Sequence, residues 1–188
     1  LLALDKDIDA IRFAELNFKE KNFSIKHTGF EDIDSINIAK AADGILFDFG
    51  LCSTHYDDPL RGFSFSKAGP LDMRIDLRQS NKLEDLLQTV EPETLANIIY
   101  QYGDEKESRK ISQAIINSYR DGRILNTIDL AEVIKKSKAR SPSKIHPATQ
   151  TFQALRIYLN DEINNLKAGL KKSKDLLKTG GRIVCISF

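Results

Sequence analysis

Apolar runs and amphipathic stretches alternate along the first fifty residues of the chain. Residues 1–5 and 23–27 carry the short apolar or alternating patterns of strands, and residues 43–49 carry the apolar run of a buried strand. A short helix is expected to begin at Phe30. Helical spacing predicts a helix over 7–19, with one buried stripe made of Ile8, Ile11, Phe13 and Leu16. Strand–helix–strand–helix–strand order is typical of a doubly wound α/β sheet.

The pattern becomes helical in the second half and returns to a strand only at the end. A helix over 148–177, interrupted near Asn160, leads to a strand over 182–188, and Gly180 is expected to end the helix in a left-handed conformation. Thr127 is expected to cap an earlier helix. The earlier helices are expected over 81–89, 92–102, 104–119 and 127–138. The sheet therefore resumes after a helical insertion.

Composition is that of an ordinary soluble protein. The 188 residues are 41% hydrophobic and 29% charged, enough to bury a core as one domain with an insertion. We find no apolar run of membrane-spanning length and no signal segment, and two cysteines suit a reducing compartment, so we expect a cytoplasmic protein. The three histidines are scattered without ligand spacing, which disfavours a metal site.

The net charge of +1 conceals a strong asymmetry. Residues 1–60 carry 6 Lys and Arg against 12 Asp and Glu, whereas residues 106–144 carry 10 against 4. A basic segment beside an acidic one indicates that part of the surface meets a polyanion, although a solvated Lys-rich helical face gives the same count. Within the basic loop that follows, Arg140, Lys144 and His146 are candidates for contacts with a phosphate backbone.

Two strands of the predicted sheet end on an acid, where open α/β sheets place their ligands. Asp5 ends the first strand, and it is either a ribose-binding acid or a helix cap. Asp48 ends the strand over 43–49, and about 28 residues without helical or strand period follow it, a length typical of functional loops. His55 in this loop reads as a polar loop residue when taken alone. Cys52 reads as packing or lining of the site.

The same loop combines cations with aromatic side chains. Arg61, Lys67 and Arg74 alternate with Phe63 and Phe65, a combination that can hold phosphates and stack bases of RNA. Two phenylalanines that anchor the loop on the core, together with an Asp–Arg pair that includes Arg74, explain the pattern equally well. Both interpretations can hold at once.

The motifs of this loop resemble those of one known family. The run DGILFDFGLCSTHYDDPLRGFSFSKAGPLDMRID is similar to the signature of the small-subunit rRNA cytidine N4-methyltransferases, the RsmH or MraW family. The resemblance continues through YGDE, LAE and HPATQTFQALRI to the final GGRIVCISF, and it covers essentially the whole chain.

The resemblance implies S-adenosylmethionine as methyl donor and a cytidine in the decoding centre of 16S rRNA, in the small ribosomal subunit, as acceptor. Asp5 matches the ribose-binding acid of the family, Phe30 its adenine-contacting residue, Asp48 the acid that closes the cofactor pocket, and His55 a further cofactor position often occupied by Gln. Asp48 and the loop Leu51–Tyr56 are also the candidates for polarising the cytidine amine. We expect a Rossmann-like methyltransferase core, residues 1–77 and 147–188, with a helical RNA-recognition insertion over 78–146.

The family also carries a Gly-rich loop upstream of the segment that matches Leu1–Asp5, and a further segment beyond the match to Phe188. We therefore expect the chain to be an internal fragment that shows no detectable methyl transfer by itself. An RNA-binding remnant without catalysis is the main competing hypothesis. A nicotinamide-dependent oxidoreductase is disfavoured because the phosphate-binding Gly-x-Gly-x-x-Gly loop is absent from the sequence.

Overall fold

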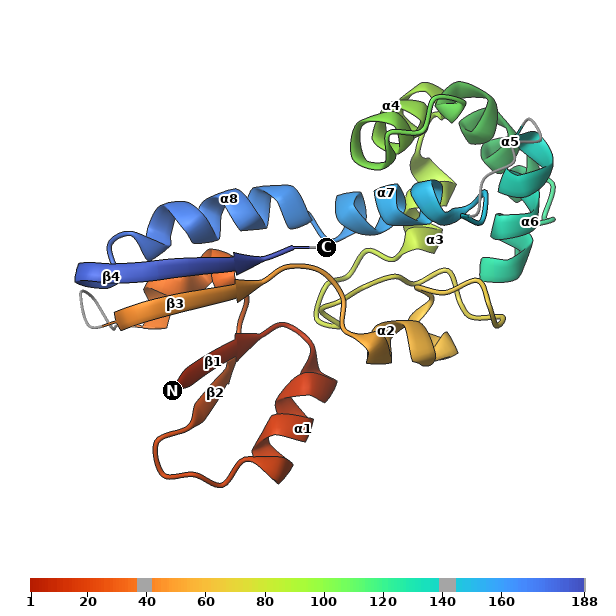
Figure 1. Ribbon diagram of the computed structural model, residues 1–188. Coiled ribbons are helices and arrows are strands. Elements are labelled where there is room, and N and C mark those ends of the chain that lie inside the picture. The colour runs from red at the N-terminus through yellow and green to blue at the C-terminus, as the bar shows by residue number, and fades with distance from the viewer. Residues whose placement is uncertain (37–41, 139–144, 188) are drawn as a thin grey trace. The chain divides into compact units, whose positions relative to one another are not determined.

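A computed structural model of the chain describes residues 1–36, 42–138 and 145–187 (Figure 1). The chain divides into two compact units. We call the first the α/β unit; it consists of Leu1–Leu51, Ile75–Leu77 and Asp161–Phe188. We call the second the helical unit; it consists of Cys52–Arg74 and Arg78–Asn160.

The α/β unit contains all the strands of the described residues. Its β1 pairs with β2 and its β3 with β4, both in parallel register, and the pairs form two separate two-stranded sheets. The expected strands are confirmed, but the described residues do not join them into one continuous sheet, because β1 and β3 share no ladder hydrogen bonds. The elements are β1 (Leu2–Asp5), α1 (Ile8–Asn17), β2 (Ser24–His27), the 3₁₀ helix η1 (Phe30–Ile36), β3 (Ala42–Asp48), α8 (Glu162–Ser173) and β4 (Leu177–Ile186).

The core of the α/β unit lies under β3, where η1 and α8 pack. Phe47 of β3 is buried with side chains from η1 and from the segment that follows α8, and Leu2 and Leu4 of β1 pack against the same cluster. The buried members are Ile33, Ile36, Phe47 and Leu176. Alternation along β3 places Asp48 on the opposite face from Phe47, and Asp48 is exposed.

The buried face of α1 differs from the expected stripe. Ile11 and Ala14, one turn apart, are buried, whereas Phe13 and Leu16 are 62% and 73% exposed. The prediction that Phe13 and Leu16 belong to a buried stripe is therefore wrong. The physical reason is that α1 packs on β1 and β2 through the small face at Ile11 and Ala14.

Gly180 has a left-handed conformation, with φ of +82°, but it does not end a helix. The preceding helix α8 ends at Ser173, and Gly180 lies inside β4. Ala42 of β3 pairs with Leu177 of β4, and Gly44 pairs with Arg182. Between these two pairs β4 contains more residues than β3, and the extra residues form a bulge. The glycine conformation thus serves an irregularity of the strand, and the prediction of a helix cap at Gly180 is wrong.

The helical unit confirms the expected run of helices. Pro92 lies in the first turn of its helix, as its fixed φ favours. The sequence predicts no helical or strand period in the segment that follows Asp48, and this is wrong in part, because two short helices form there. The elements are α2 (Ser53–Asp57), the 3₁₀ helix η2 (Pro59–Arg61), α3 (Leu83–Thr89), α4 (Pro92–Gly103), α5 (Ser108–Arg120), α6 (Thr127–Ser137) and α7 (Thr149–Leu159).

Helix α6 is capped by Asn126, not by Thr127. The Asn126 side chain accepts hydrogen bonds from the amides of Ile128 and Asp129. Thr127 is fully buried; its hydroxyl donates to the Lys67 carbonyl and accepts from the Gly69 amide. The residue predicted as a cap therefore fixes the loop that carries Lys67.

The interruption expected near Asn160 is confirmed. Helix α7 ends at Leu159, α8 begins at Glu162, and Asp161 between them adopts a left-handed φ of 49°. This break is also the boundary of the two compact units. Residues 52–74 and 147–160 belong to the helical unit. The expected division into core and insertion differs from these units and stays a prediction; it places the core at 1–77 and 147–188 and the insertion at 78–146. Within the described residues, no helix combines the length and apolar character needed to cross a membrane.

Candidate functional site

Asp5 and Asp48 lie at the carboxyl ends of β1 and β3, as the sequence predicts. Asp5 also takes part in local structure, because its Oδ1 accepts a hydrogen bond from the Asp7 amide at 2.8 Å. The true cap of α1 is Asp7, whose side chain accepts from the Asp9 amide. A carboxylate offers about four acceptor positions, so this one local bond is compatible with ribose hydroxyls as further donors.

An ion pair ties the end of β1 to η1, which carries Phe30. Lys6, directly after Asp5, places its Nζ 2.5 Å from Oε1 of Glu31, directly after Phe30. On the other side of η1, Lys172 of α8 donates to the Glu31 carbonyl at 2.7 Å and pairs with Asp34 at 2.8 Å. Hydrogen bonding to Lys172 lowers the pKa of Asp34 and raises that of Lys172. These contacts link, within one unit, the two segments that carry the candidate ribose and adenine residues.

Phe30, the expected adenine-contacting residue, belongs to a cluster of three aromatic rings. The Phe30 ring meets Phe47 and Phe49 edge to face, with centroids 5.7 and 5.8 Å apart, and Phe47 and Phe49 stack on each other. Gly169 of α8 permits this packing, because a Cβ there would lie 2.8 Å from Phe30 Cδ2 and 3.0 Å from the Phe30 carbonyl oxygen. Phe30 is only half-buried, so part of its ring can meet a ligand.

His55 lies in the helical unit, on α2, and is 5% exposed. Its Nδ1 is 2.9 Å from Sγ of Cys52, and its ring packs edge to face on Phe63 with centroids 5.3 Å apart. Cys52 is exposed and is also 2.8 Å from the Thr54 hydroxyl. This exposure disagrees with the interpretation of Cys52 as packing, whereas its interpretation as lining of the site stays a prediction. Because Asp5, Phe30 and Asp48 belong to the α/β unit, the cofactor role of His55 stays a prediction.

The loop after η2 folds closely on itself, and two glycines make this possible. A Cβ on Gly62, whose φ is +74°, would lie 2.3 Å from the Pro70 carbonyl oxygen, and one on Gly69 would lie 1.9 Å from that of Pro59. Met73 is fully buried with a left-handed φ of 60°, and its carbonyl accepts from Asn160 Nδ2 at 2.8 Å. A non-glycine residue in this conformation costs about 1–2 kcal/mol, so the surrounding contacts must hold it.

Two of the predicted RNA-binding cations are engaged inside the helical unit. Arg61 is 8% exposed and donates to the Arg74 carbonyl at 3.2 Å. Arg74 holds both carboxylate oxygens of Asp72 at 2.8 Å and donates to the Gln79 carbonyl. Burial would raise the pKa of Asp72, but the hydrogen bonds and charge of Arg74 outweigh it, and the pKa is lowered. The interpretation of Arg74 as part of an Asp–Arg pair is confirmed.

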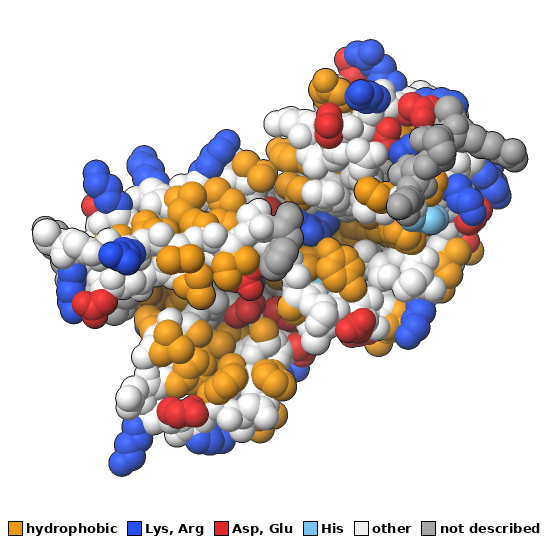
Figure 2. All heavy atoms as spheres, in the orientation of Figure 1, with side chains coloured by type: hydrophobic (Ala, Val, Ile, Leu, Met, Phe, Trp, Pro, Cys, Tyr) orange, Lys and Arg blue, Asp and Glu red, His pale blue; other side chains and the backbone are white. Residues whose placement is uncertain are grey.

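The remaining predicted RNA contacts differ in what the structure says of them. Lys67 is exposed, and His146 is exposed and stacks on Phe65. Arg140 and Lys144 lie outside the described residues. On the face drawn in Figure 2, Lys and Arg side chains are visible over α8 and also over the helical unit.

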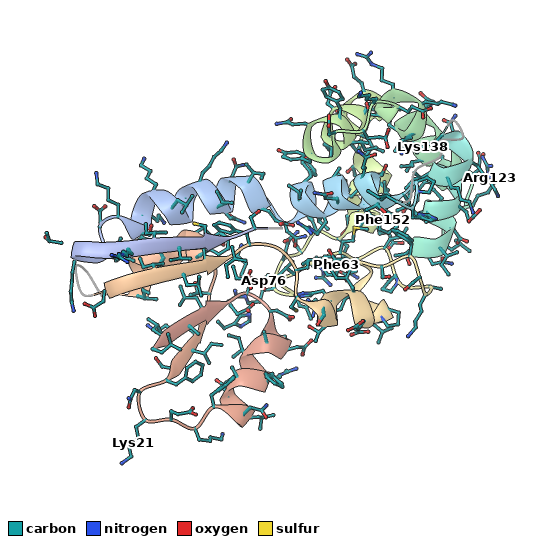
Figure 3. All side chains as sticks on the ribbon, in the orientation of Figure 1. Lys21, Phe63, Asp76, Arg123, Lys138 and Phe152 are labelled. Atoms are coloured by element: carbon teal, nitrogen blue, oxygen red, sulfur yellow. The ribbon has the colours of Figure 1, made fainter. Side chains whose placement is uncertain are left out.

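Sequence reasoning missed two polar contacts of the helical unit. The carboxylate of Glu105, 4% exposed, pairs with Lys138, whose ammonium also donates to the Pro147 carbonyl at 3.1 Å (Figure 3). Arg156 of α7 lies 3.5 Å from the hydroxyl of Tyr56 on α2. No local pattern joins residues so far apart in the chain; only the acid of the YGDE motif gave a hint that Glu105 matters. Among the described residues, no three His, Cys, Asp or Glu side chains gather as a metal ion would require.

These features define a mixed α/β protein with a helical unit, in which acids end parallel strands beside an aromatic cluster, a typical setting for ligand binding. Comparison of the sequence with known families gives a more specific result. The model of the MraW methylase family matches residues 1–188, and the chain belongs to this family. The resemblance seen in the motifs is thereby confirmed.

Individual relatives agree with the family. The chain is 41% identical over 192 residues to ribosomal RNA small subunit methyltransferase H of Hydrogenovibrio crunogenus, covering 100% of this chain and 61% of the relative. It is 39% identical over 193 residues to the protein of the same name from Legionella pneumophila strain Paris, covering 100% and 63%. The chain thus spans about three fifths of the length of these curated relatives.

Proposed function

We propose that the protein containing this chain transfers a methyl group from S-adenosylmethionine to the exocyclic N4 amine of a cytidine in the decoding centre of 16S rRNA. The observation that carries the proposal is the family match over residues 1–188, with relatives named ribosomal RNA small subunit methyltransferase H. A Rossmann-like core, a cytoplasmic location and the small ribosomal subunit as partner belong to the same proposal.

The residues of the α/β unit fit a nucleoside cofactor. Asp5 is a partly exposed carboxylate at a strand end, and Phe30 is a partly exposed ring backed by Phe47 and Phe49. Asp5 would accept hydrogen bonds from the ribose hydroxyls, and Phe30 would contact the adenine ring. When bound, S-adenosylmethionine would supply an activated methyl group on its sulfonium. The ion pair of Lys6 with Glu31 supports the proposal, because it fixes the spacing of the two contacts.

The acceptor amine sets the task of the remaining residues. The lone pair of a cytosine N4 is delocalised into the ring, so the amine is a poor nucleophile and must be aligned and relieved of a proton. Asp48, which is exposed at the end of β3, is the side chain that we propose for polarising the amine, together with the loop Leu51–Tyr56. The RNA would be held by the helical unit, with Lys67, Arg140, Lys144 and His146 as the proposed contacts.

Arg61 and Arg74 remain in the proposal as residues that shape the loop carrying Lys67. Their guanidinium groups hold the Arg74 carbonyl and the Asp72 carboxylate, respectively. A rigid loop supports RNA binding, because less conformational freedom is lost when a ligand binds to it.

The cofactor assignment is tested by replacing Asp5. Two charge-assisted hydrogen bonds to ribose are worth about 1.5–3 kcal/mol each, so Asp5→Ala should weaken S-adenosylmethionine binding at least tenfold in calorimetry. Asp9→Ala, which removes an exposed acid of α1 close by, is the matched control and should leave the affinity unchanged. Equal affinity in both variants would remove Asp5 from the site.

The activity itself is tested by radiolabelled methyl incorporation into small-subunit rRNA, with the protein at the full length of its relatives. Incorporation at a single cytidine N4 supports the proposal. RNA binding without incorporation would favour the competing hypothesis of a binding protein, and calorimetric binding of NAD in place of S-adenosylmethionine would contradict both.

A further inference from the structure

Phe65 and His146 form an aromatic stack at the surface of the helical unit. Their ring centroids are 4.5 Å apart and their planes are inclined by 29°. Phe65 also meets Phe152 of α7 edge to face, with centroids 4.8 Å apart, and Phe152, labelled in Figure 3, is 5% exposed. The three rings therefore run from the core to the surface, with His146, which is exposed, as the outermost.

The imidazole of His146 is held in one orientation. Its Nδ1 accepts a hydrogen bond from the Ala148 amide at 3.2 Å, and its carbonyl accepts from the Thr149 amide at 3.0 Å. Because Nδ1 is an acceptor here, the proton of the neutral ring is assigned to Nε2. The structure thus presents an aromatic ring that is fixed at the start of α7.

The loop that supplies Phe65 is itself fixed. Phe63, two residues earlier, is buried and packs on His55, so alternate side chains of the loop anchor it at two points. Beyond Phe65, the Lys67 carbonyl accepts from the buried Thr127 hydroxyl, while Lys67 itself is exposed. A rigid ring beside an exposed cation is the combination with which proteins bind single-stranded nucleic acid.

We propose that His146 is a stacking platform for one unpaired base of RNA, with Phe65 as its backing and Lys67 as the neighbouring phosphate contact. The inference rests on the proposed function in one respect, namely that RNA is the partner. It replaces the phosphate contact that the sequence suggests for His146, because Phe65 and the Ala148 amide already order the ring, and an ordered exposed ring offers its face to a base. Unpaired bases are required, since the faces of bases inside a duplex are already covered.

The experiment measures binding of a short single-stranded RNA that contains 2-aminopurine, whose fluorescence is quenched by stacking, at pH 8 and several salt concentrations. His146→Ala should weaken binding about fivefold or more and reduce the quenching, whereas His146→Phe should retain both. The slope of log affinity against log salt should stay unchanged in His146→Ala but fall by about one in Lys67→Ala.

Tyr100→Ala is the matched control, since Tyr100 is another exposed ring of the helical unit, 60% exposed on α4, and its loss should change nothing. Unchanged affinity in His146→Ala overturns the inference, and so does an equal loss in His146→Ala and His146→Phe, which would indicate a hydrogen bond or a charge. If the unaltered protein binds no RNA, the RNA part of the proposed function fails together with this inference. Binding without methyl transfer leaves the platform intact and contradicts the proposed activity alone.

Discussion

Gly169→Ala tests whether α8 positions the ring of Phe30. In a helix interior, Ala is favoured over Gly by about 1 kcal/mol. Against this gain, the new Cβ would lie 2.8 Å from Phe30 Cδ2 and 3.0 Å from the Phe30 carbonyl oxygen, inside ordinary contact distance. Overpacking of this kind costs about 1–3 kcal/mol. We expect a net loss of about 1 kcal/mol, seen as about fivefold lower amide hydrogen-exchange protection of α8.

A double-mutant cycle with Phe30→Ala separates the two effects. Removing the ring abolishes the closest contact, so Gly169→Ala should cost little or nothing in the Phe30→Ala background, and the coupling should be about 1–2 kcal/mol. Lys167→Ala, on the exposed face of the same helix, controls for helix propensity. In the protein at its relatives' length, Gly169→Ala should also weaken S-adenosylmethionine binding severalfold. An identical effect of Gly169→Ala in both backgrounds would refute the reasoning.

Two further predictions concern the helical unit, which contains all five tyrosines of the chain, so that tyrosine fluorescence reports on its unfolding. Glu105→Ala leaves the ammonium of Lys138, whose side chain is 15% exposed, without its carboxylate partner, and should destabilise the unit by about 2–3 kcal/mol. Adding Lys138→Met removes the unpaired charge and should restore part of the lost stability. If the double variant is as unstable as Glu105→Ala, the loss is not a charge effect. The lowered pKa of Asp72 means that its pair with Arg74 stabilises the protein above the unfolded pKa of about 4 and loses this contribution as the pH falls through the lower folded value. The difference in Tm between the protein and Asp72→Asn should therefore narrow below about pH 4, and a constant difference down to pH 2.5 would count against the pair.

Most elements of the fold can be predicted from the sequence because their signals are local. The apolar run of β3, Pro92 in the first turn of α4, and the break after Asn160 each depend on a few neighbouring residues. Pairing depends on distant residues, and there the predictions fail. The bulge that contains Gly180 lies opposite Ala42–Gly44 and arises from the register between β4 and β3. The local sequence around Gly180 therefore cannot predict it.

The same division holds for the candidate site. A strand that ends on an acid identifies Asp5 and Asp48 from local pattern alone. The partners that position these groups come from elsewhere: Lys6 meets Glu31, and η1 is held by Lys172 of α8. For Arg61 and Arg74, the composition of the loop suggested RNA as ligand, but Arg61 donates to the Arg74 carbonyl and Arg74 pairs with Asp72 within the helical unit.

The RGFSF segment shows that a motif can be identified in the sequence although the contacts of its side chains cannot be predicted from it. Neighbouring residues of an extended segment point in opposite directions, and a turn in the loop can send even alternate residues to different partners. Here Phe63 packs on His55 and Phe65 on His146, two histidines that the sequence placed in different functional roles. The loop therefore contacts a predicted cofactor residue and a predicted RNA residue within three positions. A substitution at Phe65 that changed S-adenosylmethionine affinity as well as RNA affinity would indicate that this shared loop couples the two ligands, because a contact made only with RNA cannot alter cofactor binding in its absence.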